Sequence, residues 1–109
     1  MPVVSRAPTA FARSPEQRLR ALAKANEVRV ARARLKRGVA AGRIELARVL
    51  ADPPACALTA KVRALLLVVP RIGPVRADRA LARCRIAHAK TVGGLSDRQR
   101  AELVELLGR

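Results

Sequence analysis

The chain has 109 residues, with 23 lysines and arginines against 8 aspartates and glutamates, and its formal charge at neutral pH is +15. So short a chain forms one domain with a modest core, and so basic a surface repels itself unless an acidic partner neutralises it, which favours nucleic acid. The one aromatic residue, Phe11, argues against a protein that stacks single-stranded or flipped bases, so the expected partner is the backbone of duplex DNA.

Hydropathy and cysteine spacing exclude other classes. The longest apolar run, residues 64–70, is too short to span a bilayer, no helix pairs a basic face with a leucine-rich one, and the N-terminus lacks a secretory signal. We therefore expect a cytoplasmic protein without membrane contact. Cys56, Cys84 and His88 lack zinc-finger spacing and a fourth ligand, so we expect no metal and no cofactor, and we interpret the cysteines as small buried thiols.

The first third of the chain predicts a basic arm followed by one long helix. Residues 1–14 contain arginine and serine but no acid, which is typical of a flexible arm. Ser14 and Gln17 have the spacing of a capping box and Pro15 suits the first helical position, so a helix is expected over residues 15–37, ending before a glycine. The helix has no clean apolar stripe, and we expect its first half to be weakly docked.

Basic residues recur along this helix. A turn of 100° per residue places three of them on one side, and with a fourth near the helix end they form a candidate second DNA surface. The alternative is a solvated basic face that contacts nothing. The four candidates are Arg29, Arg32, Lys36 and Arg37.

Residues 43–108 predict a compact core of four helices. The first is expected over residues 43–51, because a run of aspartate and prolines follows it. Thr59 is expected to cap the second helix, Pro74 to begin the third, and a second capping box at Ser96 to open the last. Since no segment shows sustained strand alternation, the predicted fold class is all-α.

The turn between the second and third core helices is the strongest candidate site. Pro70 ends one helix, Gly73 tolerates a positive φ, and the unpaired N–H groups at the next helix start, with arginines beside them, would bind a phosphate. A linker over residues 85–95 is expected to turn back toward this hairpin and add two contacts. The alternative is an ordinary helix-turn-helix connection. The candidate DNA contacts are Arg71, Ile72, Gly73, Pro74, Val75, Arg76, Arg79, Lys90 and Gly93.

The turn resembles helix-hairpin-helix and helix-two-turns-helix elements, which hold DNA or RNA without reading its sequence. Five blocks in order, at residues 14–18, 34–38, 61–66, 70–77 and 94–100, extend the resemblance to the actinobacterial integration host factor family. That resemblance implies a small nucleoid-associated protein, monomeric in solution, whose long N-terminal helix leads into a helix-two-turns-helix core. It further implies that such a protein binds chromosomal duplex DNA, in several copies along it, bends or compacts it, and affects supercoiling, transcription and phage integration.

Three departures from the family pattern stand out. The stretch from His88 to Gly93 leaves Lys90 as one firm charge where the family tends to carry an arginine-rich run, so a DNA contact is expected to be weaker there. Residues 67–69 are more apolar than in relatives, which makes Leu67 a candidate for self-association. The stretch between residues 52 and 58 is rich in proline rather than acidic.

Two other function classes fit parts of the sequence. Ribosomal proteins use a similar turn, so the alternative function is a ribosomal-type structural RNA-binding protein. A DNA glycosylase or lyase would use Asp97 as its catalytic aspartate. We expect no enzyme and no small-molecule substrate, because Asp97 sits in the first turn of a capped helix and no aromatic side chains are available to wall a base pocket.

Overall fold

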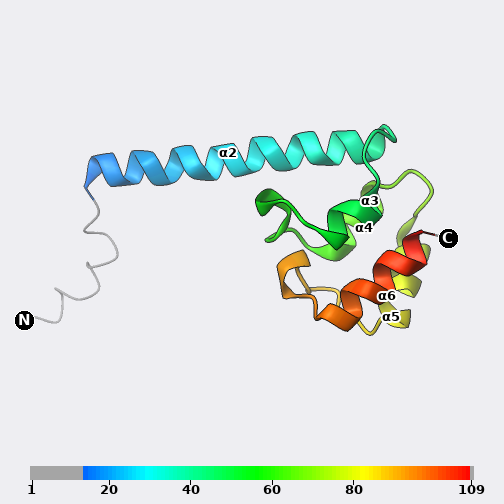
Figure 1. The fold of residues 1–109 in the computed structure, drawn as a ribbon. Helices are drawn as coiled ribbons and strands as arrows, with labels where there is room; N and C mark the ends of the chain where they lie inside the picture. The colour runs from blue at the N-terminus through cyan, green and yellow to red at the C-terminus, as the bar shows by residue number, and fades with distance from the viewer. Residues whose placement is uncertain (1–13, 109) are drawn as a thin grey trace, which may run out of the picture.

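A computed structural model describes residues 14–108, so all but the last residue of the predicted basic arm lies outside the described residues. The described chain is helical, and apart from one antiparallel bridge between Lys61 and Thr91 it contains no strand pairing, which confirms the all-α class. Its elements, shown in Figure 1, are α2 Pro15–Ala40, α3 Leu46–Ala51, η2 Ala55–Ala57, α4 Val62–Val68, α5 Pro74–Arg83, η3 Val92–Gly94 and α6 Asp97–Leu107.

Helix α2 begins as the sequence predicts and ends later. The Ser14 hydroxyl accepts from the Gln17 amide at 3.1 Å, and the Gln17 side chain accepts from the Ser14 amide at 2.9 Å. The helix runs past its predicted end at Arg37 to Ala40, because Gly38 is buried inside it rather than ending it. A Cβ on Gly38 would collide with the Ile44 side chain. The chain reverses instead at Gly42, whose φ is +81°.

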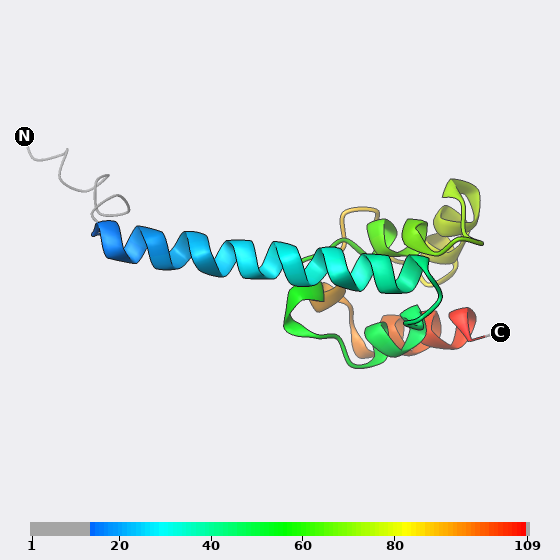
Figure 2. The same ribbon diagram turned by 90° about the horizontal axis from the view of Figure 1, so that it is seen from above.

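The first half of α2 projects away from the rest of the molecule (Figures 1 and 2). Every residue from 15 to 27 is exposed, whereas Leu35 and Val39 in the second half are buried. The molecule measures 60 × 28 × 23 Å, and its length comes from this helix. The prediction of a weakly docked first half is confirmed.

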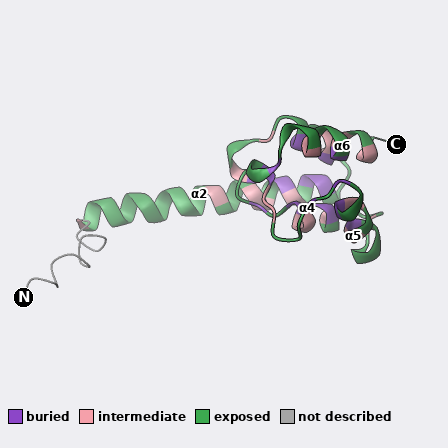
Figure 3. Cartoon of the chain, turned by 90° about the horizontal axis from the view of Figure 1, so that it is seen from below, coloured by how far each residue is buried: buried purple, intermediate pink, exposed green. Residues whose placement is uncertain are grey.

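The core lies beneath the second half of α2. Helix α3 packs on α6, α4 packs on α5, and α2 covers η2 and α4. Figure 3 shows that the buried residues gather in this part and leave the projecting helix exposed. Arg100 joins two segments by donating to the Leu50 carbonyl at 2.7 Å and to the Val92 carbonyl at 3.1 Å. The fully buried core side chains include Leu50, Val62, Leu65, Leu66, Leu81, Val92 and Leu103.

Two predicted helix starts are wrong. The first core helix begins at Leu46 rather than at Arg43, because Arg43 and Ile44 turn back and donate to the Gly38 carbonyl at 2.9 and 3.1 Å. Lys61, not Thr59, is the N-cap of α4 and makes no side-chain cap, while the Thr59 hydroxyl accepts a hydrogen bond from Arg32. The contact with Arg32 on α2 therefore uses the Thr59 hydroxyl that the sequence predicted to cap α4.

The C-terminal elements follow the prediction more closely. Ser96 and Gln99 form the second capping box, with distances of 3.1 and 3.0 Å, and Asp97 lies in the first turn of α6. Both cysteines are free thiols. Cys84 is buried, and burial is the main cause that raises the pKa of its thiol, while Cys56 is half-buried.

Candidate nucleic-acid interface

The turn between α4 and α5 is short and closed by its own backbone. The Ile72 amide donates to the Val69 carbonyl at 3.0 Å, and Pro74 is the first residue of α5, as predicted. Gly73 is the N-cap with φ −92° and ψ −179°, which is extended backbone open to any residue, so the turn does not use the tolerance of glycine for a positive φ. The first amides of α5, Val75 and Arg76, lack intrahelical acceptors and form the positive end of the helix dipole.

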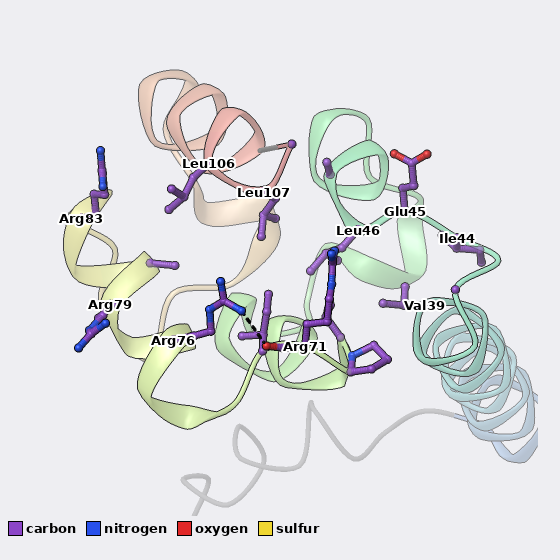
Figure 4. A pocket seen from close by; sticks show the side chains of 17 residues that line it. Val39, Ile44, Glu45, Leu46, Arg71, Arg76, Arg79, Arg83, Leu106 and Leu107 are labelled. Carbon is purple, nitrogen blue, oxygen red and sulfur yellow. Dashed lines mark hydrogen bonds between the residues drawn. The ribbon is translucent and has the colours of Figure 1, made fainter.

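Arginines surround this helix start. The Arg76 guanidinium donates to the Arg71 carbonyl at 3.2 Å, and this bond fixes Arg76 against the turn (Figure 4). Arg79 and Arg83 follow along α5, and none of Arg71, Arg79 and Arg83 forms an ion pair within residues 14–108. The predicted cluster of Arg71, Arg76 and Arg79 is brought together, since all three line one groove. Arg83 lies one turn beyond Arg79, farther from the helix start, and lines the groove described next without belonging to this cluster.

A groove of about 840 Å³ adjoins the turn. One wall is α5 and the turn, and the other combines the end of α6, the start of α3 and the segment that leaves α2, as Figure 4 shows. Arg71 and Arg76 reach into the groove, while Leu106 and Leu107 extend from α6 on the far side. No sequence pattern predicted this groove, since three separate segments build it.

One acid on α5 is already paired. The Asp78 carboxylate accepts from Arg63 Nε at 2.8 Å, and His88 Nε2 lies 3.3 Å from the same oxygen. The hydrogen bond from Arg63 is the main cause that lowers the pKa of the Asp78 carboxyl group, against some desolvation, and the charges of Arg63 and His88 act in the same direction. This pairing leaves the other side of α5 to its unpaired arginines.

Lys90 and Gly93 lie away from the α4–α5 turn. The Lys90 carbonyl accepts from the Val62 amide at 3.0 Å, and the Gly93 amide donates to the Leu58 carbonyl at 2.9 Å. A Cβ on Gly93 would come within 3.0 Å of that carbonyl oxygen, which explains the glycine. Figures 1 and 2 place η3 and the α4–α5 turn at opposite ends of the core. The expectation that the linker turns back toward the hairpin is therefore wrong, because it pairs with the segment before α4.

The four candidates on α2 differ in their surroundings. Arg32 donates from Nε to the Cys56 carbonyl at 3.1 Å and from Nη2 to the Thr59 hydroxyl, so its guanidinium joins α2 to η2. Lys36 is half-buried, and Arg29 and Arg37 are exposed. Arg29 and Lys36 lie seven residues apart and share one side of the helix. Because Arg32 is bonded to η2 and Lys36 is half-buried, the basic surface of α2 is narrower than the sequence suggested.

The described residues contain neither a candidate metal site nor a candidate membrane-spanning helix. No group of three histidine, cysteine, aspartate or glutamate side chains within residues 14–108 lies close enough to hold a metal. Over the same residues, no helix has both the length and the apolar character needed to cross a membrane.

Comparisons with known proteins agree with this architecture. The family described as the S13-like H2TH domain matches residues 39–107. The integration host factor of Mycobacterium tuberculosis strain H37Rv is 39% identical over 95 residues, which cover 85% of this chain and 90% of the relative. That of Mycolicibacterium smegmatis is 39% identical over 92 residues, covering 83% and 88%.

A solved structure is also similar. It is described as sIHF bound to an 8-bp palindromic DNA, with a TM-score of 0.70 and 31% identity, and the match covers 78% of this chain and 98% of that one. The family resemblance found in the sequence is thus confirmed. The chain belongs to the integration host factor family, and its core is an S13-like H2TH domain.

Proposed function

We propose that this chain is a nucleoid-associated protein that binds the backbone of duplex DNA with little sequence preference. The observation that carries the proposal is the α4–α5 turn, where the first amides of α5, which have no intrahelical acceptors, lie beside Arg71 and Arg76. The DNA-bound structure of the similar sIHF supports it. Membership of the integration host factor family also agrees with the prediction that the chain is not an enzyme.

In the proposed complex the turn clamps the phosphates of one strand. The amides at the start of α5 and the guanidinium groups of Arg71 and Arg76 bind one phosphate, and Arg79 binds a neighbour. Residues 72–75 contribute mainly their backbone to the contact. Affinity then comes mainly from counterion release, and neutralising about six phosphates gives a slope of log K against log salt of about −5. Duplexes of unrelated sequence should bind alike.

Helix α2 and the neighbouring η3 supply a second DNA surface in this proposal. Arg29, Lys36 and Arg37 on α2 extend the basic surface, and Lys90 and Gly93 lie beside the segment that α2 covers. Arg32 supports this surface mainly by holding α2 on η2. Because two separated surfaces act at once, one protein can bend a duplex or bridge two of them.

The cellular role follows from this geometry. We place the protein in the cytoplasm on the nucleoid, as a monomer in solution that binds in several copies along DNA. By bending or compacting the chromosome it would affect supercoiling, transcription and integration.

Fluorescence anisotropy across a salt series tests the main surface. The partners are a generic duplex, its single strand and an RNA hairpin, and the variants are Arg71→Glu with Arg76→Glu against a control, Arg48→Glu with Arg98→Glu. The control removes equal charge from exposed positions on α3 and α6 outside the groove. We expect duplex preference, lost in the first pair and kept in the control. A preference for the RNA hairpin would support the ribosomal-type alternative instead, and equal losses in both pairs would reject the turn as the site.

A compaction assay tests the second surface. Arg29→Glu with Lys36→Glu should reduce compaction of long DNA far more than it reduces binding to a short duplex, because a single surface suffices for the short site. The matched control is Arg20→Glu with Arg34→Glu. It changes the net charge by the same amount as the first pair, but its two positions lie on other sides of α2. An equal loss of compaction and binding would contradict the two-surface proposal.

A further inference from the structure

The groove beside the α4–α5 turn has two chemically different walls. Arg71, Arg76, Arg79 and Arg83 line one side of its 840 Å³, and Glu45 is the acid at the opposite rim. The other side is apolar, and its leucines are Leu46, buried at the start of α3, and the half-buried Leu106 and Leu107 (Figure 4). The volume is within the range of about 300–1,000 Å³ typical of ligand sites.

Duplex backbone uses only one of these walls. Sugars and phosphates present anionic oxygens, which the arginines satisfy, but they offer no apolar ridge to cover Leu106 and Leu107. A ligand matched to the whole groove needs carboxylates or phosphates along one edge and apolar groups along the other. The two walls come from α5 and α6, so the complementary groups must repeat along an extended segment rather than sit on one small head group.

We propose that the groove binds an acidic amphipathic helix of a partner protein. Its apolar face lies on Leu106, Leu107 and Leu46, and its carboxylates pair with Arg79 and Arg83, whose guanidinium groups form forked hydrogen bonds. Four arginines against one glutamate favour an acidic segment and repel the basic α2 of a second copy. This goes beyond the proposed DNA binding and does not rest on it.

Besides Arg79, which both proposals use, the two kinds of partner meet at Arg71 and Arg76. Both side chains reach into the groove and also stand beside the helix start proposed for phosphate. A helix in the groove therefore competes with duplex for the same guanidinium groups. Arg83, Leu106 and Leu107 belong to the groove alone, so substitutions there separate the two activities.

Anisotropy of a labelled peptide measures the proposed binding. The probe has about 14 residues, with leucine at i, i+3, i+4 and i+7 and glutamate elsewhere, and a scrambled peptide of equal composition lacks the helical apolar face. Arg83→Gln and Leu107→Gln should each weaken peptide binding by about tenfold. Their matched controls are Arg98→Gln, on the outside of α6, and Leu67→Gln, 37% exposed on α4.

The peptide-binding experiment has one supporting outcome and two contradicting outcomes. The proposal is supported if the helical peptide binds, the scrambled one does not, the groove variants lose the peptide while keeping duplex affinity, and both controls keep both. Thermal melting checks whether Leu107→Gln is folded. If Leu107→Gln does not fold, the comparison rests on Arg83→Gln, whose side chain is exposed. Equal binding of both peptides would mean charge attraction alone and overturn the proposal. Absence of peptide binding, with self-association that Leu107→Gln abolishes, would assign the groove to a second copy and also overturn it.

Discussion

Both halves of α2 combine alanine with arginine, yet only the second half packs against other elements. Residues 15–27 are exposed throughout, while Leu35 and Val39 are buried and Arg32 bonds to the segment around η2. A helix of about 13 residues without packing is marginal in water, so the first half depends on its capping box and on continuity with the packed turns. The same residue types are therefore structural in one half and available to partners in the other.

Gly38→Ala should be the most damaging single change to the packed half. A Cβ there would collide with Ile44, and overpacking of this kind costs about 1–3 kcal/mol of unfolding free energy. Urea denaturation measures it. Gly73→Ala is the matched control, since nothing lies within 4 Å of a Cβ there and its φ is ordinary. Equal destabilisation by both changes would show that Gly38 is not close-packed.

Arg32 and Arg29 give a sharper contrast, because they lie three residues apart on the boundary between the halves. Arg32→Met removes two hydrogen bonds and should lower the unfolding free energy by about 1–3 kcal/mol while leaving the salt slope of DNA binding nearly unchanged. Arg29→Met should leave stability unchanged and reduce the slope by about 1. Denaturation and salt titration of both variants check this, and exchanged phenotypes would contradict the assignment.

Ala23→Gly tests the independence of the projecting half. Glycine lowers local helix stability by about 1 kcal/mol, so amide exchange over residues 15–27 should quicken. The melting temperature should not change, because no core side chain depends on this segment. A lower melting temperature would mean that the projecting half is coupled to the core.

Acid pH should produce the smallest effect, confined to the packed region. The folded pKa of Asp78 lies below its ordinary value of 3.8, so the carboxylate contributes stability at neutral pH that is lost as pH falls below that value. Asp78→Asn should therefore flatten the loss of stability as pH falls from about 4 toward 2. Asp52→Asn, an exposed acid, is the control. Identical acid profiles for wild type and Asp78→Asn would reject the pairing with Arg63.

Local sequence signals predicted the elements that depend on near neighbours. The capping boxes at Ser14 and Ser96 and the proline at the start of α5 each involve residues within one turn, and each is as expected. Gly38, Thr59 and Lys90 were misread, because their surroundings come from residues far along the chain: Ile44 fills the space above Gly38, Arg32 takes the Thr59 hydroxyl, and Val62 pairs with Lys90.

The candidate site divides in the same way. Arg71, Arg76 and Arg79 are close in sequence and close in space, so the cluster could be predicted from spacing alone. The apolar wall opposite them comes mainly from α6, some thirty residues further on, and the packing of α6 on α3 and α5 brings it there. Whether a basic residue is available also depends on tertiary contacts, as Arg32 shows.

The projecting half of α2 makes the helix a lever. About 20 Å of exposed helix extends beyond the packed half of α2, a length that spans about six base steps of a duplex. A sideways force on this exposed half of α2 is transmitted to its junction with the core. Arg32, Leu35 and the contact between Gly38 and Ile44 hold the helix there. In the proposed DNA-bound complex, the stiffness of that junction, rather than the number of charges along the helix, would set how far the protein bends the duplex.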